Sequence, residues 1–287
     1  MTSLPVSKDS IPASELSKQY PSSIKSDLET LIPKSQDGRD KFFNNELREL
    51  TLTQDREVAK NKSGYISLQD FRRRVEAHSQ DQVLSDTLGC DISNQEELTS
   101  FCQGSAYITK VRITYEIGDQ GIAQLADALR SNNSLTSIVI WQGQIGDAGA
   151  KALAAALQEN RTLKELLLPA NRIGNEGAQA FAAALKVNTT LTALSLSGNS
   201  VGNEGGKLLA EALEVDQSLT SLSLFCNYYI HAEGVIALAD SLLVNKTLVK
   251  LDLGSNEIGK EGLKALQDIQ AKYPKREITL GFTERDA

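Results

Sequence analysis

The chain has 287 residues, of which 40% are hydrophobic and only 5% aromatic, and its formal net charge is −7 at pH 7. This length and apolar share suffice for one or two folded domains and argue against a wholly disordered protein. The acidic balance argues against the basic surface that nucleic acid or anionic lipid requires, so we expect no nucleic-acid partner. Three cysteines without a CxxC pair favour neither a disulfide framework nor a zinc site.

The beginning of the chain predicts a tail rather than a targeting signal. Residues 1–22 are polar, hold three of the six prolines and show no sustained period, so we predict a flexible tail. No apolar segment resembles a signal peptide, and no apolar run is long enough to cross a bilayer. We therefore expect no membrane span, and a protein that is cytoplasmic or delivered into a host cell without a classical signal peptide.

Residues 23–105 predict a small helical domain. Apolar residues at helical spacing, such as Ile24 with Leu28 and Phe71 with Val75, indicate short helices. We expect this domain to cap the N-terminal edge of the array that follows, because a terminal repeat otherwise exposes apolar surface.

One loop in this region has the spacing of a calcium site. The segment from Asn61 to Phe71 resembles the later part of an EF-hand loop. However, Ala59 stands where the first Asp ligand belongs, and Asp70 stands where a longer, bidentate Glu belongs. We therefore expect no metal and no other cofactor, and favour a helix-turn-helix. An enzyme or calcium-regulated switch in residues 24–105, with the repeats as a targeting region, is the alternative function.

The rest of the chain is an internal repeat. Similar segments begin every 28 or 29 residues, at Leu135, Leu163, Leu191, Leu219 and Leu248. Four of them open with Leu-x-x-Leu-x-Leu, and the one at Leu135 substitutes Ile138 and Ile140. This alternation predicts a short strand with one face inward. Apolar residues then recur at i, i+3, i+4 and i+7, which predicts a helix with one apolar stripe. A strand and a helix of this size cannot bury their own apolar faces, so neighbouring units must stack into a solenoid.

Polar residues and glycines mark the turn before each helix. In four units an Asp or Asn follows an Ile-Gly or Val-Gly pair, and we expect it to cap the N-terminus of its own helix. These residues are Asp119, Asp147, Asn175 and Asn203. A glycine two positions later, as at Gly149 and Gly177, indicates a close approach of helix to sheet. Four Asn-x-Ser/Thr sequences recur just before a strand, which indicates turn chemistry rather than glycosylation.

A buried ladder of asparagines is predicted beside the strands. In four units an Asn stands three residues after the last strand leucine, where its amide can bond backbone groups of its own and the adjacent unit. The members are Asn171, Asn199, Asn227 and Asn256. Gly143 stands at this place in an earlier unit, so we expect the ladder to begin at Asn171. Its role is structural, not catalytic.

Over residues 106–287, the pattern Leu-x-x-Leu-x-Leu-x-x-Asn-x-Ile-Gly-x-x-Gly resembles the ribonuclease-inhibitor-type leucine-rich repeat. The resemblance implies an α/β horseshoe of about six repeats and a closing strand at Ile278–Leu280, with a parallel concave sheet and convex helices. It also implies protein binding. The pattern is similar to the repeat regions of NLR-type receptors and to bacterial effectors that contain such repeats. Near-uniform repeats without a nucleotide-binding domain favour the second group, as an effector that acts on a host protein.

No sequence context marks a catalytic residue. The thiol and imidazole candidates lack a recognisable nucleophile or base motif, and they are Cys90, Cys102, Cys226, His78 and His231. The glycine-containing turns recur in every unit, so they belong to the repeat and not to a phosphate-binding loop. We therefore predict that the protein is not an enzyme.

The candidate partner site lies on the predicted concave face. Residues that alternate with the buried leucines point to that face, where apolar and aromatic groups flank a trough of small residues. The predicted partner-binding residues are Val139, Trp141, Leu167, Pro169, Phe225, Tyr228 and Tyr229. The two tyrosines belong to a one-residue insertion, which in repeat arrays often lies at a binding face. We expect a monomer that binds another protein there, and expect Ala at Trp141 or Phe225 to weaken binding without much loss of stability.

Overall fold

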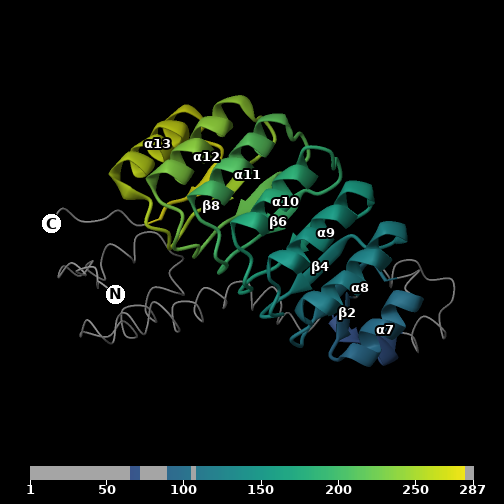
Figure 1. The fold of residues 1–287 in the computed structure, drawn as a ribbon. Coiled ribbons are helices and arrows are strands. Elements are labelled where there is room, and N and C mark those ends of the chain that lie inside the picture. Colours follow the sequence, from purple (N-terminus) through teal and green to yellow (C-terminus); the bar gives the residue numbers. More distant parts are fainter. Residues whose placement is uncertain (1–64, 72–88, 105–107, 282–287) are drawn as a thin grey trace, which may run out of the picture.

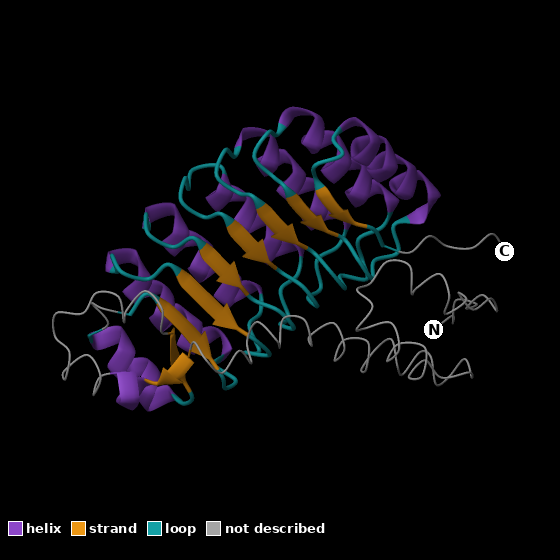
Figure 2. Ribbon diagram, turned by 180° about the vertical axis from the view of Figure 1, so that it is seen from behind, coloured by secondary structure: helices purple, strands orange, loops and turns teal. Residues whose placement is uncertain are grey.

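One curved sheet with helices on a single side organises the chain (Figure 1). The computed structural model describes residues 65–71, 89–104 and 108–281. In this part of the chain, nine parallel strands pair in sequence order from β1 to β9. The strands line the inner, concave side, and the helices cover the outer side (Figure 2). This arrangement confirms the predicted α/β solenoid with a parallel concave sheet.

Short strands alternate with helices along the solenoid. The strands are β1 (Tyr65–Ser67), β2 (Gly89–Ile92), β3 (Lys110–Ile113), β4 (Ser137–Ile140), β5 (Glu165–Leu167), β6 (Ala193–Ser195), β7 (Ser221–Ser223), β8 (Lys250–Asp252) and β9 (Glu277–Thr279). The helices are α7 (Gln95–Gln103), α8 (Gly118–Ser131), α9 (Asp147–Glu159), α10 (Asn175–Leu185), α11 (Asn203–Val215), α12 (Ala232–Val244) and α13 (Gly259–Lys272).

A continuous row of aliphatic side chains joins the units. Its central members pair in register across adjacent strands and are at most 1% exposed: Ile138, Leu166, Leu194, Leu222 and Leu251. The apolar stripe of each helix packs against this row from the outer side. Because each unit's apolar surface is covered by its neighbours, hydrophobic burial couples the units to one another.

The sheet extends across the predicted domain boundary at residue 106. Strands β1 and β2 lie at its N-terminal end, and Cys90 of β2 pairs with Val111 of β3. Helix α7 follows β2, so one strand–helix unit precedes the first predicted unit. The tail over residues 1–22 and most of the helical domain over residues 23–105 lie outside the described part of the chain, so both stay predictions.

The described end of the calcium-like loop makes strand and helix-capping contacts. Ser67 ends strand β1, and residues 68–71 form a helical turn. The Ser67 hydroxyl donates to Asp70 Oδ2 at 2.8 Å and accepts the Asp70 N–H at 3.1 Å. This reciprocal pair is a helix cap, so the Ser–Asp spacing has a structural explanation. Residues 59–64 lie outside the described part.

The turn carboxylates and amides cap the next helix rather than their own. Asp147 Oδ1 accepts the N–H groups of Gly174 and Gly177 at the start of α10, at 2.7 and 2.9 Å. The same pair of bonds to the following helix is made by Asp119, Asn175 and Asn203. The prediction that each residue caps its own helix is therefore wrong, because the first turn of one helix lies against the N-terminus of its successor. Each cap ties two units together.

The repeated glycines let consecutive helices touch. A Cβ on Gly177 would lie 2.8 Å from Ala150 Cβ of α9 and 2.8 Å from Asp147 Oδ1. It would also lie 2.6 Å from Ile173 Cγ2 in the preceding turn. Contacts this short are sterically forbidden, so only glycine fits. The close approach is thus between neighbouring helices, not between helix and sheet as the sequence indicated.

Buried asparagines close the turns that follow the strands. Asn199 Nδ2 donates to the carbonyls of Leu168, Leu196 and Ser197 at 2.9, 2.9 and 3.1 Å. Its Oδ1 accepts the Ile173 N–H at 3.0 Å. Equivalent bonds to neighbouring turns are made by Asn171, Asn227 and Asn256. Since each amide joins two units, this ladder is part of the structural frame.

A second row of amides lies at the opposite edge of the sheet, where the helices end. Asn188 Nδ2 donates to the carbonyls of Leu157 and Asn160 at 2.7 and 3.1 Å. Asn160 and Asn245 make equivalent bonds, and all three asparagines are at most 3% exposed. They belong to the Asn-x-Ser/Thr sequences, whose buried, bonded amides support the interpretation as turn chemistry.

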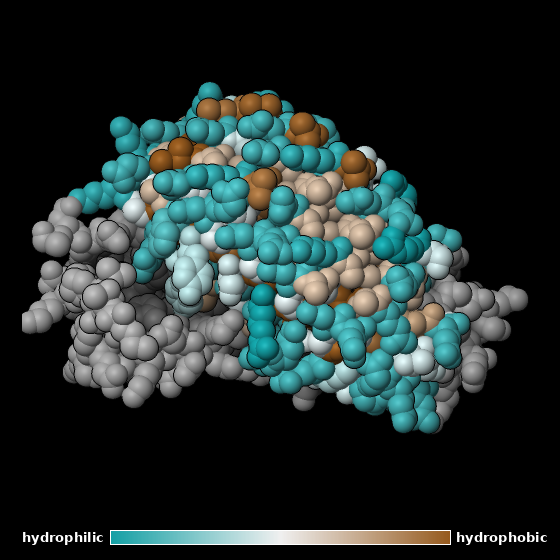
Figure 3. All heavy atoms as spheres, in the orientation of Figure 1, coloured by the Kyte–Doolittle hydropathy of each residue, from teal (hydrophilic) through white to brown (hydrophobic). Residues whose placement is uncertain are grey.

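The outer side is largely hydrophilic, and its most hydrophobic side chains form small separate groups with weakly hydrophobic area between them (Figure 3). Lysine–glutamate pairs join adjacent helices there, for example Lys207 and Glu233 at 2.7 Å. Such exposed pairs contribute little to stability. Among the described residues, no helix is both long and apolar enough to cross a membrane.

Candidate functional site

The character of the concave face changes along the sheet. Because side chains alternate on a strand, the residues between the core leucines face the concave side. One such row runs in register from Val139 and Leu167 through Ser195 and Ser223 to Asp252. The row is therefore apolar in β4 and β5, lined by hydroxyls in β6 and β7, and acidic in β8.

The seven predicted partner residues lie at different depths. Three are buried: Val139, Pro169 and Phe225. Three are half-buried: Trp141, Leu167 and Tyr228. The seventh, Tyr229, is 65% exposed. The first three therefore support the surface from below, and the other four can contribute contact area to a partner.

Phe225 packs onto the following repeat. A Cβ on Gly254 would lie 2.8 Å from Phe225 Cε2, so this glycine leaves the space that the ring occupies. The side chain is only 6% exposed. Replacing a buried phenylalanine by alanine opens a cavity and costs about 3–5 kcal/mol. We therefore expect Phe225→Ala to destabilise the protein, in place of the small loss of stability that the sequence indicated.

The inserted residue displaces a tyrosine outward. The Ile230 N–H bonds the Asn227 carbonyl at 2.9 Å, which closes the enlarged turn. Tyr229 pairs with Gly202 of the preceding turn as an isolated bridge, so its backbone is fixed. A Cβ on Gly202 would lie 3.2 Å from Tyr229 Cβ, so the two turns pack closely. The insertion thus presents an aromatic side chain on an ordered backbone at the turn edge of the sheet.

Three serines and an aspartate form a hydrogen-bonded chain on the concave side. Ser197 Oγ lies 2.9 Å from Ser195 Oγ and 2.8 Å from Ser223 Oγ. Ser223 donates in turn to Asp252 Oδ2 at 3.4 Å, and Asp252 Oδ1 accepts the Gly254 N–H at 3.0 Å. Burial raises the pKa of Asp252 above its usual 3.8, although these hydrogen bonds oppose the shift. The chain therefore ends in a carboxyl group that holds its proton to higher pH.

The N-terminal end of the concave face carries a charged cluster. Arg112 donates through Nε and Nη2 to both carboxylate oxygens of Asp91, each at 2.7 Å. The guanidinium also lies 4.6 Å from the centre of the Tyr65 ring. A Cβ on Gly89 would lie 2.2 Å from that ring, so glycine lets it lie flat on β2. The cluster satisfies its own charges and is therefore structural.

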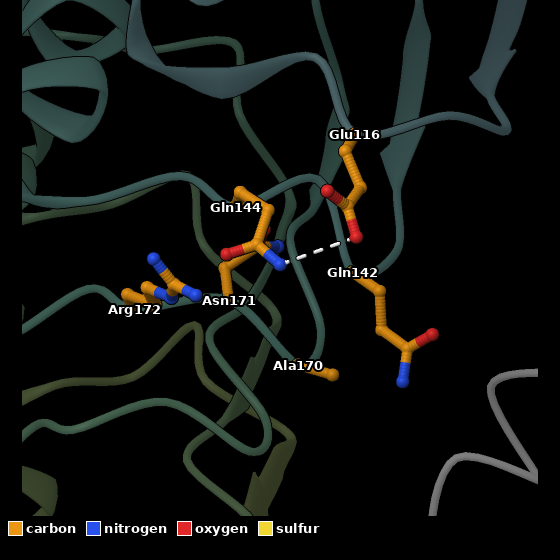
Figure 4. A pocket seen from close by; sticks show the side chains of 6 residues that line it. All are labelled: Glu116, Gln142, Gln144, Ala170, Asn171 and Arg172. Carbon is orange, nitrogen blue, oxygen red and sulfur yellow. Dashed lines mark hydrogen bonds between the residues drawn. The ribbon is translucent and has the colours of Figure 1, made fainter.

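A polar hollow lies at the turn edge, beside strands β3 to β5 (Figure 4). Its volume is about 300 Å³, and it is lined by Glu116, Gln142, Gln144, Ala170, Asn171 and Arg172. Gln142 and Gln144 have left-handed backbones, with φ of 52° and 58°. Gln144 Nε2 donates to Glu116 Oε1 at 3.3 Å. The lining suits hydrogen-bonding groups rather than an apolar ligand. Sequence reasoning missed this hollow, although Gly143 at the ladder position marked the turn as irregular.

The described thiols are poorly suited to nucleophilic catalysis. Cys90 and Cys226 are buried, and burial raises the pKa of the Cys102 thiol to about 11. Such a thiol is protonated and unreactive at neutral pH. Within the described ranges, no group of three or more His, Cys, Asp and Glu side chains could hold a metal ion.

Comparison with known proteins identifies the repeat. A family model described as "Leucine Rich repeat" matches residues 131–154, 159–182, 187–210, 215–239 and 244–266. The solved structure titled "Leiomodin-1 Actin-Binding Site 2 (ABS2)" is similar at 17% sequence identity and a TM-score of 0.39, covering 62% of this chain and 87% of that chain. No curated protein matches the chain. The matched segments show five leucine-rich repeats between residues 131 and 266.

Proposed function

We propose that this protein is a non-enzymatic interaction module, which binds another protein through the concave sheet and the adjoining turn edge. Leucine-rich repeats are typically protein-interaction modules, and stacked repeats create extended concave surfaces suited to that task. The observation that carries the proposal is Tyr229. The array does not need an extra residue there, yet the insertion holds a 65% exposed aromatic side chain on an ordered backbone.

The contact surface combines Tyr229 with the half-buried members of the concave row. Partly exposed aromatic and aliphatic surface for contact with a partner comes from Trp141, Leu167 and Tyr228. Tryptophan and tyrosine are enriched among the residues that dominate binding energies at interfaces. Beside these groups, half-buried Ser223 and Asp252 supply polar contacts that fix orientation, while buried Ser197 bonds Ser223 from below. Such a surface fits a folded protein or a peptide with apolar side chains.

The finer assignments from resemblance belong to the same proposal. The ribonuclease-inhibitor subtype, the likeness to NLR-type repeats and a role as a bacterial effector rest on the repeat pattern in the sequence. They concern where the protein acts and on which host protein. A cytoplasmic location and a monomeric state are likewise hypotheses, which light scattering and fractionation would test.

Site-specific photo-crosslinking tests the proposed surface. A photoreactive phenylalanine analogue replaces Tyr229, and the same analogue replaces Val215 as a control, because Val215 is 58% exposed at the end of helix α11. In lysate of the native host, position 229 should crosslink one protein that position 215 does not. Crosslinking of the same protein at equal yield from both positions would contradict the proposal.

A matched pair of substitutions provides the second measurement. Tyr229→Ala should reduce capture of the crosslinked protein by about tenfold, as expected for an aromatic contact residue. Because Tyr229 is largely exposed, its melting temperature should stay close to that of the wild type. Val215→Ala should retain full capture. Undiminished capture by the Tyr229→Ala variant would refute the contact surface.

A further inference from the structure

A second hollow lies at the C-terminal end of the solenoid. Its volume is about 470 Å³, and it is formed by the turns that lead into strands β8 and β9. We name it the C-terminal hollow. Its lining residues are Lys246, Leu248, Val249, Lys272, Tyr273, Pro274, Lys275 and Arg276. It therefore combines an apolar floor with four cationic side chains.

The floor contains a residue that the repeat does not require. The residue before strands β4 to β7 is Thr136, Lys164, Thr192 and Thr220, and the residue before β8 is Val249. In all five the backbone N–H bonds a carbonyl of the preceding unit at 2.7–2.8 Å. The three threonines add a hydroxyl bond to the same carbonyl at 3.0 Å. Valine cannot make this bond, and Val249 is nevertheless 49% exposed. Folding alone thus favours threonine at this position.

The rim concentrates positive charge around one aromatic ring. The Lys246 and Lys272 ammonium groups each lie 5.6 Å from the centre of the Tyr273 ring, and the Arg276 guanidinium lies 4.8 Å from it. Cations are attracted to the face of an aromatic ring, and this attraction offsets part of the electrostatic repulsion among the three cationic groups. The rim of the C-terminal hollow is therefore positive, although the whole chain has a net charge of −7.

These cations have no carboxylate partners in the described part of the chain. Other exposed lysines pair with a glutamate of the neighbouring unit, for example Lys207 with Glu233 at 2.7 Å and Lys250 with Glu277 at 2.8 Å. By contrast, no carboxylate of the described residues lies within 4.0 Å of the cationic groups that line the C-terminal hollow. The like charges around Tyr273 therefore create a positive potential that an anionic partner would relieve.

Only part of this charge has a structural task. Arg276 Nη1 donates to the Leu242 carbonyl at 2.9 Å and Nη2 donates to the Asn245 carbonyl, so Arg276 closes the second amide row at the end of the array. Lys246 Nζ donates to the Leu243 carbonyl at 3.0 Å at the end of α12. Lys272 and Lys275 are exposed, and no described group accepts a side-chain hydrogen bond from either. The latter two are free to bind a partner.

We infer that the C-terminal hollow binds an acidic segment of a partner protein, with one apolar side chain of that segment on Val249 and Tyr273 and its carboxylates beside Lys272 and Lys275. The apolar floor favours a peptide over a phosphate or a nucleic acid, because those ligands need only the cations. The hollow lies where strands begin, whereas Tyr229 lies at the edge where strands end. The two surfaces are therefore independent, and this inference stands if the concave proposal fails.

Peptide selection on the full chain tests this inference. A display library of random peptides of about a dozen residues is selected on the immobilised wild-type protein. Peptides recovered should place Asp or Glu on both sides of a Leu, Ile or Phe. Their affinity should fall as salt rises, because exposed charge pairs are screened. If selection recovers no binder, or only peptides without acidic residues, the inference is wrong.

Matched variants then assign the binding to the hollow. Val249→Thr introduces the residue that three other units carry, so it should fold as well as the wild type, which a melting curve verifies. Both this variant and the Lys272→Glu/Lys275→Glu double variant should bind a selected peptide about tenfold more weakly. The controls Val215→Thr and Lys264→Glu, which lie outside the hollow, should bind within about twofold of the wild type.

Two further probes distinguish the other occupants. Vesicles with anionic lipid and a short DNA duplex should bind poorly, and their binding should not depend on Val249. Stronger binding of either probe than of the selected peptides would overturn the inference. So would a tenfold gain in peptide affinity on deletion of residues 282–287, since the chain's own end would then be the occupant.

Discussion

The cap that Asp147 makes on helix α10 allows a sharp test of how the units are coupled. Asp147 Oδ1 accepts the N–H groups of both Gly174 and Gly177, at 2.7 and 2.9 Å. Helix α10 has no capping side chain of its own, because Gly174 stands at its N-cap position. Asp147→Ala therefore leaves two helix N–H groups without an acceptor, one of them on a buried residue.

The cost of this substitution follows from known contributions. A lost helix cap costs about 1 kcal/mol, and a hydrogen bond to a charged acceptor contributes about 1.5–3 kcal/mol. We expect Asp147→Ala to lower the free energy of unfolding by about 2–3 kcal/mol, and the melting temperature by about 4–12 °C. Asp147→Asn should cost only about 0.5 kcal/mol, because an amide oxygen does the same task at Asn175 and Asn203.

Urea unfolding followed by circular dichroism measures both variants. Asp240→Ala, an exposed acidic residue on helix α12, serves as the control and should change stability by less than about 0.5 kcal/mol. Gly177→Ala should cost less in the Asp147→Ala background, because a Cβ on Gly177 would lie 2.8 Å from Asp147 Oδ1. The cap between units is refuted if Asp147→Ala costs no more than the control, or if Asn is as harmful as Ala.

Three more predictions follow from buried polar groups. Asn199→Ala should cost about 3 kcal/mol in urea unfolding, since among the described residues it leaves the Leu168 carbonyl and the Ile173 N–H without a hydrogen bond and removes one of two bonds at the Leu196 and Ser197 carbonyls, whereas exposed Asn133→Ala should cost almost nothing. Burial raises the pKa of Asp252 in the folded state, so its contribution to stability is full at pH below 3.8 and is lost as pH rises through the raised folded pKa. Asp252→Asn should therefore reduce the change of melting temperature with pH over that window. A pH profile equal to that of the wild type would count against the shift. With the Cys102 pKa at about 11, the folded protein should react with iodoacetamide at pH 7.5 far more slowly than the unfolded chain does, and equal rates would contradict this.

The sequence was sufficient for the architecture because the fold depends on a repeated pattern. Leucines two apart, such as Leu166 and Leu168, place one strand face inward regardless of which unit they occupy. The closing strand was also predictable, and β9 contains Ile278 as expected. By contrast, β1 and β2 were missed, because Gly89–Ile92 holds no leucine and carries an aspartate at its third position. Their place in the sheet depends on pairing with β3, which a local pattern does not encode.

Contacts between units were less predictable than contacts within them. The spacing of Asp147 from the start of its own helix suggested a local cap, but the acceptor lies closer to the N–H groups of α10. Likewise, alternation placed Phe225 on the concave side, but only the structure shows that Gly254 leaves space for the Phe225 ring. In both cases the contacting residue belongs to the next repeat, nearly 30 residues along the chain. Rules of local propensity consider only nearby residues and therefore do not predict such contacts.

A residue that recurs in the array is explained by folding, and one that departs from it needs another explanation. Val187, Val215 and Val244 are each more than half exposed, but they recur at equivalent helix ends and are spaced as the repeat is. Tyr229 and Val249 each occur once, at a position where the other units carry a polar residue or none. Both side chains are exposed, so hydrophobic burial of either one adds little to the stability of the fold. Replacing either one should therefore change binding before it changes stability, and the two effects should be separable because the residues lie at opposite edges of the sheet.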